Sequence, residues 1–475
     1  MARDRTPQVR ASEDRQEWAR IGKDSLKGMG MNLIDTSKFQ VSRLIPTTGI
    51  KGALDQERRA SSAFLAVLRI IPDLAHVFLK PLGAPRGSIE TYIEPEFKMG
   101  TKKIRPDGLI VVKRGKSEWT CLVEVKTGKN DLELSQVNAY LDICKEYKLD
   151  ALVTISNELL NASGDHPTSG IDQRKLRSTK LAHLSWIRII TEALVMSEHE
   201  GVDDREQDLV LKELVRFLQS DASGASEFND MGASWISVRE GIRNSSIRKA
   251  DDDVLQVIAN FESLVRYSAL TLSARLGVNA TEVTPRAATA DYKKHLSVSG
   301  KNLLDSKTLE GAIKVPGAAA ELEMRADIAA GMLHCGFALR SPNSSRNKSR
   351  ISWLIRQLKQ APENTYVAWT YKRARSSEAP HRVRDLMDGS YEFELDNSRE
   401  ISEFHVEVLA KMGTKRASGN GGFIDSVVDL FELTYGDVLQ PIKPWQEPAP
   451  KLSQKVTDLI PEQGGSPSPS SSYNH

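Results

Sequence analysis

Residues 105–128 read RPDGLIVVKRGKSEWTCLVEVKTG. Two apolar runs are joined by the short polar link RGKS at 114–117, and this pattern predicts a β-hairpin. Asp107 precedes the first run, and Glu124 and Lys126 interrupt the second, where a buried strand would normally be apolar. A plain core hairpin has no use for these three charges, so the hairpin is a candidate functional site.

Strand geometry predicts that the three charged side chains meet. Residues two apart on a strand share a face, so Glu124 and Lys126 point the same way and the apolar residues between them face a core. A hairpin linked at 114–117 places Asp107 opposite Glu124, within about 5.5 Å. Carboxylates that close repel each other unless a cation lies between them, and their oxygen atoms suit Mg²⁺ or Mn²⁺.

A second interpretation needs no ligand, because an Asp–Glu–Lys trio on one sheet face is commonly a solvated surface or a salt-bridged cluster. The order of the surrounding elements favours a functional site. Hydrophobic periodicity predicts helix, three strands, helix and strand in turn, at 52–71, 88–98, 104–113, 118–127, 132–148 and 150–156. The predicted order is therefore αβββαβ, in a chain that is α+β overall.

Pro106–Asp107, followed by Glu-Val-Lys at 124–126, resembles the PD-(D/E)xK nuclease superfamily, also called restriction-endonuclease-like. The family core has the same αβββαβ order, so the resemblance implies an α/β core with a mixed sheet flanked by helices. Gln136 and Tyr140 resemble the Gln-x-x-x-Tyr motif of the RecB-like branch, and their spacing places both on one helical face. The resemblance covers residues 52–156 and implies a Mg²⁺-dependent (or Mn²⁺-dependent) hydrolase of phosphodiester bonds.

The resemblance also implies roles for individual residues. Asp107 and Glu124 would bind the metal ion, with the backbone carbonyl of Val125 as a further ligand. Lys126 would position the attacking water, help to deprotonate it and steady the charge of the phosphate. Such chemistry suits phosphodiester hydrolysis, which requires a nucleophilic water and relief of charge on the phosphoryl group.

Three further residues extend the implied site. Glu57, in the first helix, would bind a second metal ion or a metal-bound water, and the neighbouring Asp55 is an alternative for that role. Gln136 would orient the site, and Tyr140 would contact the backbone of the substrate. For each of these residues a purely structural role on a helix surface is the alternative. The lone loop histidine His166 is expected to have no role, with contact to the substrate as the alternative.

Composition restricts the class of protein only loosely. The chain has 475 residues, 27% of them charged, and a net charge of +2, which neither demands nor excludes a nucleic-acid partner. Cys121, Cys144 and Cys335 are scattered and show neither zinc spacing nor a disulfide framework, which favours a reducing, cytoplasmic setting. No apolar stretch approaches the roughly 18 residues of a membrane span, so no membrane partner is expected.

The remainder of the chain predicts further regions around this core. Composition and periodicity divide it into an N-terminal extension (1–45), the nuclease-like domain (46–200), a helical region (201–280), a mixed α/β C-terminal domain (300–440) and a disordered tail (441–475). No G-x-x-x-x-G-K-[ST] motif occurs, so the chain is not expected to drive a motor of its own.

Basic residues alternate with aromatic residues in the C-terminal domain, near Trp369 and Tyr371. Such alternation predicts a surface that follows a phosphate backbone and stacks on bases. The alternative is a solvated basic surface whose aromatic residues belong to the core. The basic residues chosen as candidates for nucleic-acid binding are Arg346, Lys348, Arg350, Lys372 and Arg373.

The first interpretation is therefore a metal-dependent nuclease whose C-terminal parts recognise a substrate or partner. The substrate is expected to be DNA, with RNA as an alternative, and a homodimer stays open. A rival from another class is a catalytically silent module that binds nucleic acid or protein on the same fold. A weaker rival is a structural protein with a salt-bridged hairpin.

Overall fold

The structure is a computed structural model that describes residues 39–41, 44, 53–128, 130–160, 166–225, 228–343, 346–388, 395–396 and 398–445. The expected N-terminal extension and tail therefore lie largely outside the described residues. Two compact units divide the chain. The first runs to Pro316 and includes 322–334 and 410–432; the second comprises 317–321, 335–409 and the chain from Leu433 onward.

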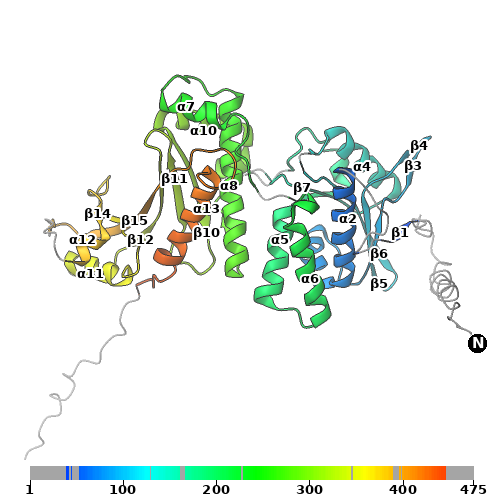
Figure 1. Ribbon diagram of the computed structural model, residues 1–475, viewed down its shortest axis with the longest axis horizontal. Coiled ribbons are helices and arrows are strands. Elements are labelled where there is room, and N and C mark those ends of the chain that lie inside the picture. The colour runs from blue at the N-terminus through cyan, green and yellow to red at the C-terminus, as the bar shows by residue number, and fades with distance from the viewer. Residues whose placement is uncertain are drawn as a thin grey trace, which may run out of the picture. The chain divides into compact units, whose positions relative to one another are not determined.

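A six-stranded mixed sheet organises the N-terminal part of the first unit, in the order β1-β2-β5-β6-β7-β8 (Figure 1). Neighbours from β1 to β6 are antiparallel, whereas β6–β7 and β7–β8 are parallel. The strands are β1 (Gln40–Val41), β2 (Ser88–Ile93), β5 (Gly108–Arg114), β6 (Ser117–Val125), β7 (Ala151–Ser156) and β8 (Lys180–Ser185). The mixed sheet and the α+β class agree with the expectation from sequence.

Helices cover both faces of this sheet. One face packs against α2 (Ala53–Ile70), α3 (Pro72–Leu79), α5 (Trp186–Val195) and α6 (Arg205–Leu218), with Trp119, Cys121, Val123 and Val125 of β6 in that core. Figure 1 shows α2, α5 and α6 along this face. The other face packs against α4 (Leu134–Tyr147), with Leu122 in its core. Pro72 separates α2 from α3 because its ring cannot continue the first helix.

The predicted hairpin exists with the predicted register. Arg114 pairs with Ser117 across a two-residue turn, and Gly108 pairs with Val123, so Asp107 falls beside Glu124. Gly115 has φ +60° at the first turn position, a conformation that glycine adopts without a steric penalty.

Two predicted strand ranges need correction. The run 88–98 ends as a sheet strand at Ile93, and 104–113 begins only at Gly108. The residues between form a separate hairpin, β3 (Phe97–Met99) with β4 (Lys102–Ile104). Pro95 and Pro106 lie at the two breaks, where the missing N–H groups of proline remove ladder hydrogen bonds.

The rest of the first unit is helical with a small antiparallel sheet. Its elements are α7 (Trp235–Arg243), α8 (Asp252–Leu276), β9 (Thr281–Glu282), α9 (Arg286–Ala290), α10 (Tyr292–Ser306), β10 (Thr308–Lys314), β11 (Leu322–Asp327) and most of α13 (Phe423–Leu433). Phe423 of α13 packs against Trp235 and Phe261. The expected regions 201–280 and 300–440 therefore do not coincide with the compact units.

The second unit contains the antiparallel strands β14 (His381–Arg382), β13 (Thr365–Tyr371) and β15 (Ile401–Lys411), with α11 (Asn347–Gln357) and α12 (Val383–Met387). The strand β12 (Met332–Arg340) ends within it. All three cysteines of the chain are free and buried. Burial raises the pKa of Cys121 and raises that of Cys144 to about 12.

Among the described residues, no single helix has the length and apolar character to cross a membrane. One bent pair, Asp55–Ile70 with Pro72–Leu82, reaches that length and composition together. Residues of both helices, such as Phe64 and Leu74, belong to the core against the N-terminal sheet.

Candidate active site

Asp107 and Glu124 approach each other on the α4 face of the sheet. Asp107 lies just before β5, and its Oδ2 accepts a 2.7 Å hydrogen bond from the backbone N–H of Val125. Glu124 pairs in register with Thr154 of β7 and is 1% exposed. The hairpin therefore brings the two carboxyl groups together, as the register argument predicts.

The two oxygen atoms of Glu124 differ in their surroundings. Oε1 accepts 2.5 Å hydrogen bonds from Lys126 Nζ and from Gln136 Nε2. Oε2 is buried and accepts no well-formed hydrogen bond from the described residues. A buried carboxylate oxygen without a donor carries a desolvation cost, so it is well suited to a cation.

Gln136 and Tyr140 reach the site from α4, one helical turn apart. Gln136 Nε2 lies 3.0 Å from Tyr140 Oη as well as 2.5 Å from Glu124 Oε1. Tyr140 is 4% exposed, so it helps to enclose the site from the α4 side. The structure thus brings together both residues of the helical motif with the carboxylate of the hairpin.

Glu57 reaches the same point from α2. Its Oε1 lies 3.6 Å from Lys126 Nζ, and both side chains are almost buried. The backbone amide of Thr127 lies close enough to the Glu57 carboxylate to lower its pKa. Asp55, the alternative to Glu57, instead forms a 2.9 Å ion pair with Arg59. Of these two acidic residues, Glu57 is the one that lies at the site.

The pKa values of the acidic residues at the site are raised, so their ionisation is costly. Burial, and then the charge of Glu124, raises the pKa of Asp107 well above its usual range. Burial also raises the pKa of Glu124 against the opposing effect of Lys126, and burial followed by Asp107 raises that of Glu57. Burial alone would lower the pKa of Lys126, but the surrounding carboxylates outweigh it and raise the value.

The donor set fits a hard divalent cation in two respects. Asp107 and Glu124 supply carboxylate oxygens, and Glu124 Oε2 is buried without a donor. In the part of the chain that the structure describes, no group of three or more His, Cys, Asp or Glu side chains is arranged to hold a metal ion. Two carboxylates with waters match the way Mg²⁺ is usually held.

Sequence reasoning missed a second cluster on the same sheet face. Thr154 lies beside Glu124 on one side and pairs with His183 of β8 on the other. Thr154 Oγ1 lies 2.9 Å from His183 Nδ1 and 2.7 Å from Nε2 of His166. The signal was weak because a lone histidine in a loop and one in a strand share no motif spacing.

The backbone groups that bond the two histidine rings determine which ring nitrogen carries the hydrogen. The Glu158 carbonyl accepts a 2.8 Å bond from His183 Nε2, so this atom carries a hydrogen, and a neutral ring then leaves Nδ1 as an acceptor for Thr154. The Thr168 amide donates to His166 Nδ1, so His166 donates through Nε2. Both rings are consequently neutral and fully bonded, and burial lowers the pKa of each to about 4.

The basic residues predicted to bind nucleic acid differ in exposure. Lys372 forms an ion pair with Glu400 but stays largely exposed. A role in binding remains a prediction for the four candidates with exposed side chains, which are Arg346, Lys348, Lys372 and Arg373.

Arg350 and the neighbouring aromatic residues belong to the interior of the second unit. Arg350 is 3% exposed, and its guanidinium binds the Pro342 carbonyl, Asn347 Oδ1 and the Glu400 carboxylate. Trp369 and Tyr371 are 2% and 3% exposed. Selecting Arg350 as a nucleic-acid contact was therefore wrong, because its donors are used within the fold. The aromatic residues match the core alternative.

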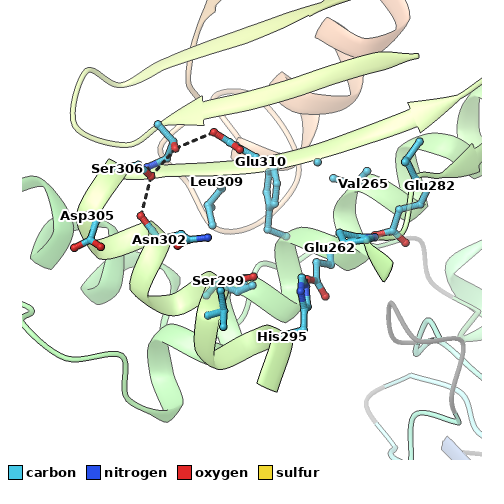
Figure 2. A pocket seen from close by; sticks show the side chains of 17 residues that line it. Glu262, Val265, Glu282, His295, Ser299, Asn302, Asp305, Ser306, Leu309 and Glu310 are labelled. Carbon is cyan, nitrogen blue, oxygen red and sulfur yellow. Dashed lines mark hydrogen bonds and ion pairs between the residues drawn. The ribbon is translucent and has the colours of Figure 1, made fainter. Parts of the chain in front are cut away.

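A separate cavity of about 570 Å³ lies in the first unit among α8, α10 and β10 (Figure 2). Glu262, one of the residues that line it, accepts hydrogen bonds from His295 at 2.6 Å and from Tyr292 at 2.9 Å, and Leu309 is among its apolar lining residues. None of the described residues that line it is Lys or Arg. This cavity contains no residue selected from sequence and does not suit a phosphate.

No family model, curated protein or solved structure matches this chain. The function is therefore argued from the side chains of the site.

Proposed function

We propose that this chain is a metal-dependent nuclease that hydrolyses phosphodiester bonds, with DNA as the expected substrate. The observation that carries the proposal is the approach of the half-buried Asp107 to the buried Glu124, two carboxyl groups whose repulsion a cation would relieve. Lys126 lies beside them with its ammonium group largely buried. A lysine next to two carboxylates can position a water and stabilise phosphate charge, which supports hydrolysis of a phosphodiester.

The proposal extends to the fold around the site. The order helix, three strands, helix and strand, with β6 antiparallel to β5 and parallel to β7, supports a restriction-endonuclease-like core. The site lies where β6 ends and the parallel pair of strands presents its carboxyl ends, a common position for ligands in open α/β sheets.

The residues would divide the work by position. A divalent cation held by Asp107 and Glu124 would neutralise phosphate charge and lower the pKa of a bound water. Lys126 would orient the attacking water and stabilise the charged phosphate. Gln136 would hold the Glu124 carboxylate in place through Oε1, and Glu57 would hold Lys126 from the opposite side. Tyr140, whose Oη lies 3.0 Å from Gln136 Nε2, would help to hold Gln136 in place.

The test is cleavage of labelled single- and double-stranded DNA and RNA by the full chain with Mg²⁺, Mn²⁺ or a chelator. We expect metal-dependent cleavage that falls at least about a hundredfold in Asp107→Asn and Lys126→Met. Lys113→Met is the matched control, because Lys113 pairs with Glu90 at 2.7 Å on the same sheet, away from the site. This control should retain cleavage.

Two results would overturn the proposal. Cleavage that survives in Asp107→Asn and Lys126→Met would show that another protein or another site is responsible. Binding of nucleic acid without cleavage under any metal condition would instead establish the silent binding module on the same fold.

A further inference from the structure

The three residues after β6, Lys126–Gly128, are held by bonds from outside the hairpin. The Lys126 amide continues the parallel ladder to the Ile155 carbonyl at 2.7 Å. The Lys126 carbonyl accepts a 2.9 Å bond from Nε1 of Trp186, the first residue of α5. The backbone that carries the Lys126 side chain is therefore fixed from two directions.

Two loops close around Gly128. The Gly128 amide donates to the Gly224 carbonyl at 2.7 Å. Asn157, directly after β7, donates through Nδ2 to the Gly128 carbonyl at 2.9 Å and to the Gly224 carbonyl at 3.0 Å. A single side-chain amide thus joins the segment after β6 to the segment after α6.

Gly224 also lies close to Thr127. It has φ +67°, and a Cβ atom placed there would lie 2.9 Å from Thr127 Cβ and 3.2 Å from Thr127 Oγ1. Thr127 is 2% exposed, so it has little room to move aside. Because Thr127 follows Lys126 directly and its amide lies close enough to lower the pKa of Glu57, a displaced Thr127 would shift Lys126 and disturb Glu57.

We propose that Asn157 and Gly224 are positioning residues of the nuclease site, which hold Lys126–Gly128 so that Lys126 and Glu57 face the two carboxylates. This inference rests on the proposed nuclease function. Gly224 follows η5 (Asp221–Ser223), beyond the boundary at 200 expected from sequence. The functional unit consequently includes the chain past α6, and the loop after α6 is a part of the site.

A pair of glycine substitutions isolates this contact in the full chain. Gly224→Ala places a Cβ against Thr127, whereas Gly331→Ala imposes the same left-handed backbone, φ +68°, with no atom within 4 Å of the new Cβ. Both variants carry the same kind of strain, so their difference reports the contact. We expect Gly224→Ala to lower kcat at least about tenfold with little change in KM, and Gly331→Ala to leave both unchanged.

Asn157 provides an independent variant. Asn157→Asp keeps the size of the side chain but cannot donate to the two carbonyls, so it should lower kcat as Asn157→Ala does. Hydrogen exchange on the metal-free full chain gives a readout separate from turnover. We expect the Gly128 amide to exchange at least about tenfold faster in both Asn157 variants and in Gly224→Ala.

The outcomes separate this inference from the proposed function. An active wild type with kcat and Gly128 exchange unchanged in Asn157→Asp and Gly224→Ala would overturn the positioning role. An equal loss of kcat in Gly224→Ala and Gly331→Ala would overturn the specific contact with Thr127. A wild type that cleaves nothing under any metal condition would overturn the nuclease function itself.

Discussion

At the end of a largely apolar sheet, Glu124 is buried and Asp107 is half-buried. Burial raises the pKa of both, and the charge of Glu124 raises that of Asp107 further, whereas hydrogen bonding with Asp107 lowers that of Glu124. By contrast, Glu90 of β2 accepts hydrogen bonds from Lys113 and Tyr92 at 2.7 and 2.8 Å. Without a cation, the Asp107–Glu124 pair therefore opposes folding. The Glu90 carboxylate, by contrast, stabilises the folded chain.

This contrast predicts opposite effects of removing a charge. Asp107→Asn should raise the free energy of unfolding of the metal-free protein by about 1 kcal/mol, because repulsion is relieved while the amide oxygen still accepts from Val125. Glu90→Gln should lower the free energy of unfolding slightly. Although burial acts against it, bonding to Lys113 and Tyr92 keeps the pKa of Glu90 low. Chemical denaturation measures both.

Metal addition completes that experiment. Mg²⁺ should raise the melting temperature of the wild type and of Glu90→Gln, and leave that of Asp107→Asn unchanged. Equal stabilisation of Asp107→Asn by Mg²⁺ would contradict a metal site at these carboxylates.

The histidine cluster predicts a dependence of stability on pH. His166 and His183 have pKa values of about 4 in the folded chain, below the usual 6.5, because burial disfavours the charged ring. The unfolded chain therefore takes up protons first as pH falls below about 6.5, and stability decreases until about pH 4. Each histidine contributes a slope of up to about 1.4 kcal/mol per pH unit in that window and none above it.

His166→Gln should reduce this slope, since it removes one of the two titrating rings. His199→Gln, which removes an exposed ring, is the matched control. Urea denaturation between pH 4.5 and 7.5 provides the measurement, and a slope that is the same in wild type and His166→Gln would refute the account.

At the scale of elements, the hairpin was predictable because two independent periodicities agreed there. The alternation of apolar residues defined the faces, and the polar link defined the register, so the approach of Asp107 to Glu124 followed. The small hairpin β3–β4 was not predictable. The run 88–98 keeps a strand-like pattern past Pro95, and only the tertiary pairing of Phe97 with Ile104 shows that a new hairpin begins.

Changing the length of a turn should affect the site in the β5–β6 hairpin and not in the β3–β4 hairpin. Inserting one glycine after Gly115 should shift the register of β5 against β6, separate Asp107 from Glu124 and reduce cleavage by at least about a hundredfold. The matched control inserts one glycine after Gly100, which begins the turn between β3 and β4 with nearly the same φ, +61° against +60°. Cleavage should persist in the control.

Those insertions are measured by cleavage rate and by circular dichroism, which checks that both chains fold. Retained activity with the insertion after Gly115 would show that the carboxylate pair is not what the reaction requires.

At the scale of the whole molecule, the domain boundaries could not be read from the sequence. Helical periodicity at 204–218 gives no sign that α6 packs on the N-terminal sheet, or that the loop after it reaches Gly128. Similarly, Asn157 looks like an ordinary loop residue, because its importance depends on carbonyls that are distant in sequence. Local pattern located the charges, whereas long-range packing determined what holds them.

In the second unit, exposed and buried basic residues should affect different properties, DNA binding in one case and stability in the other. Charge removal at the exposed residues, as in Arg346→Gln with Lys348→Gln, should raise the Kd for DNA a few-fold and reduce its salt dependence, with kcat unchanged. Arg350→Gln should instead lower the melting temperature of the second unit, because its partners would lose buried hydrogen bonds. Fluorescence anisotropy at several salt concentrations and calorimetry test the two statements.

An unchanged salt slope in the Arg346 and Lys348 variant would place DNA binding elsewhere. Weakened DNA binding in Arg350→Gln at full thermal stability would restore that residue as a contact.

The buried cysteines allow the local opening of each unit to be measured separately. Cys121 and Cys144 lie in the first unit and Cys335 in the second, and all three are buried thiols. A thiol reagent can modify them only after local opening, so single-cysteine variants would report separate labelling rates for the two units. Unequal rates would show which of the two units opens more readily.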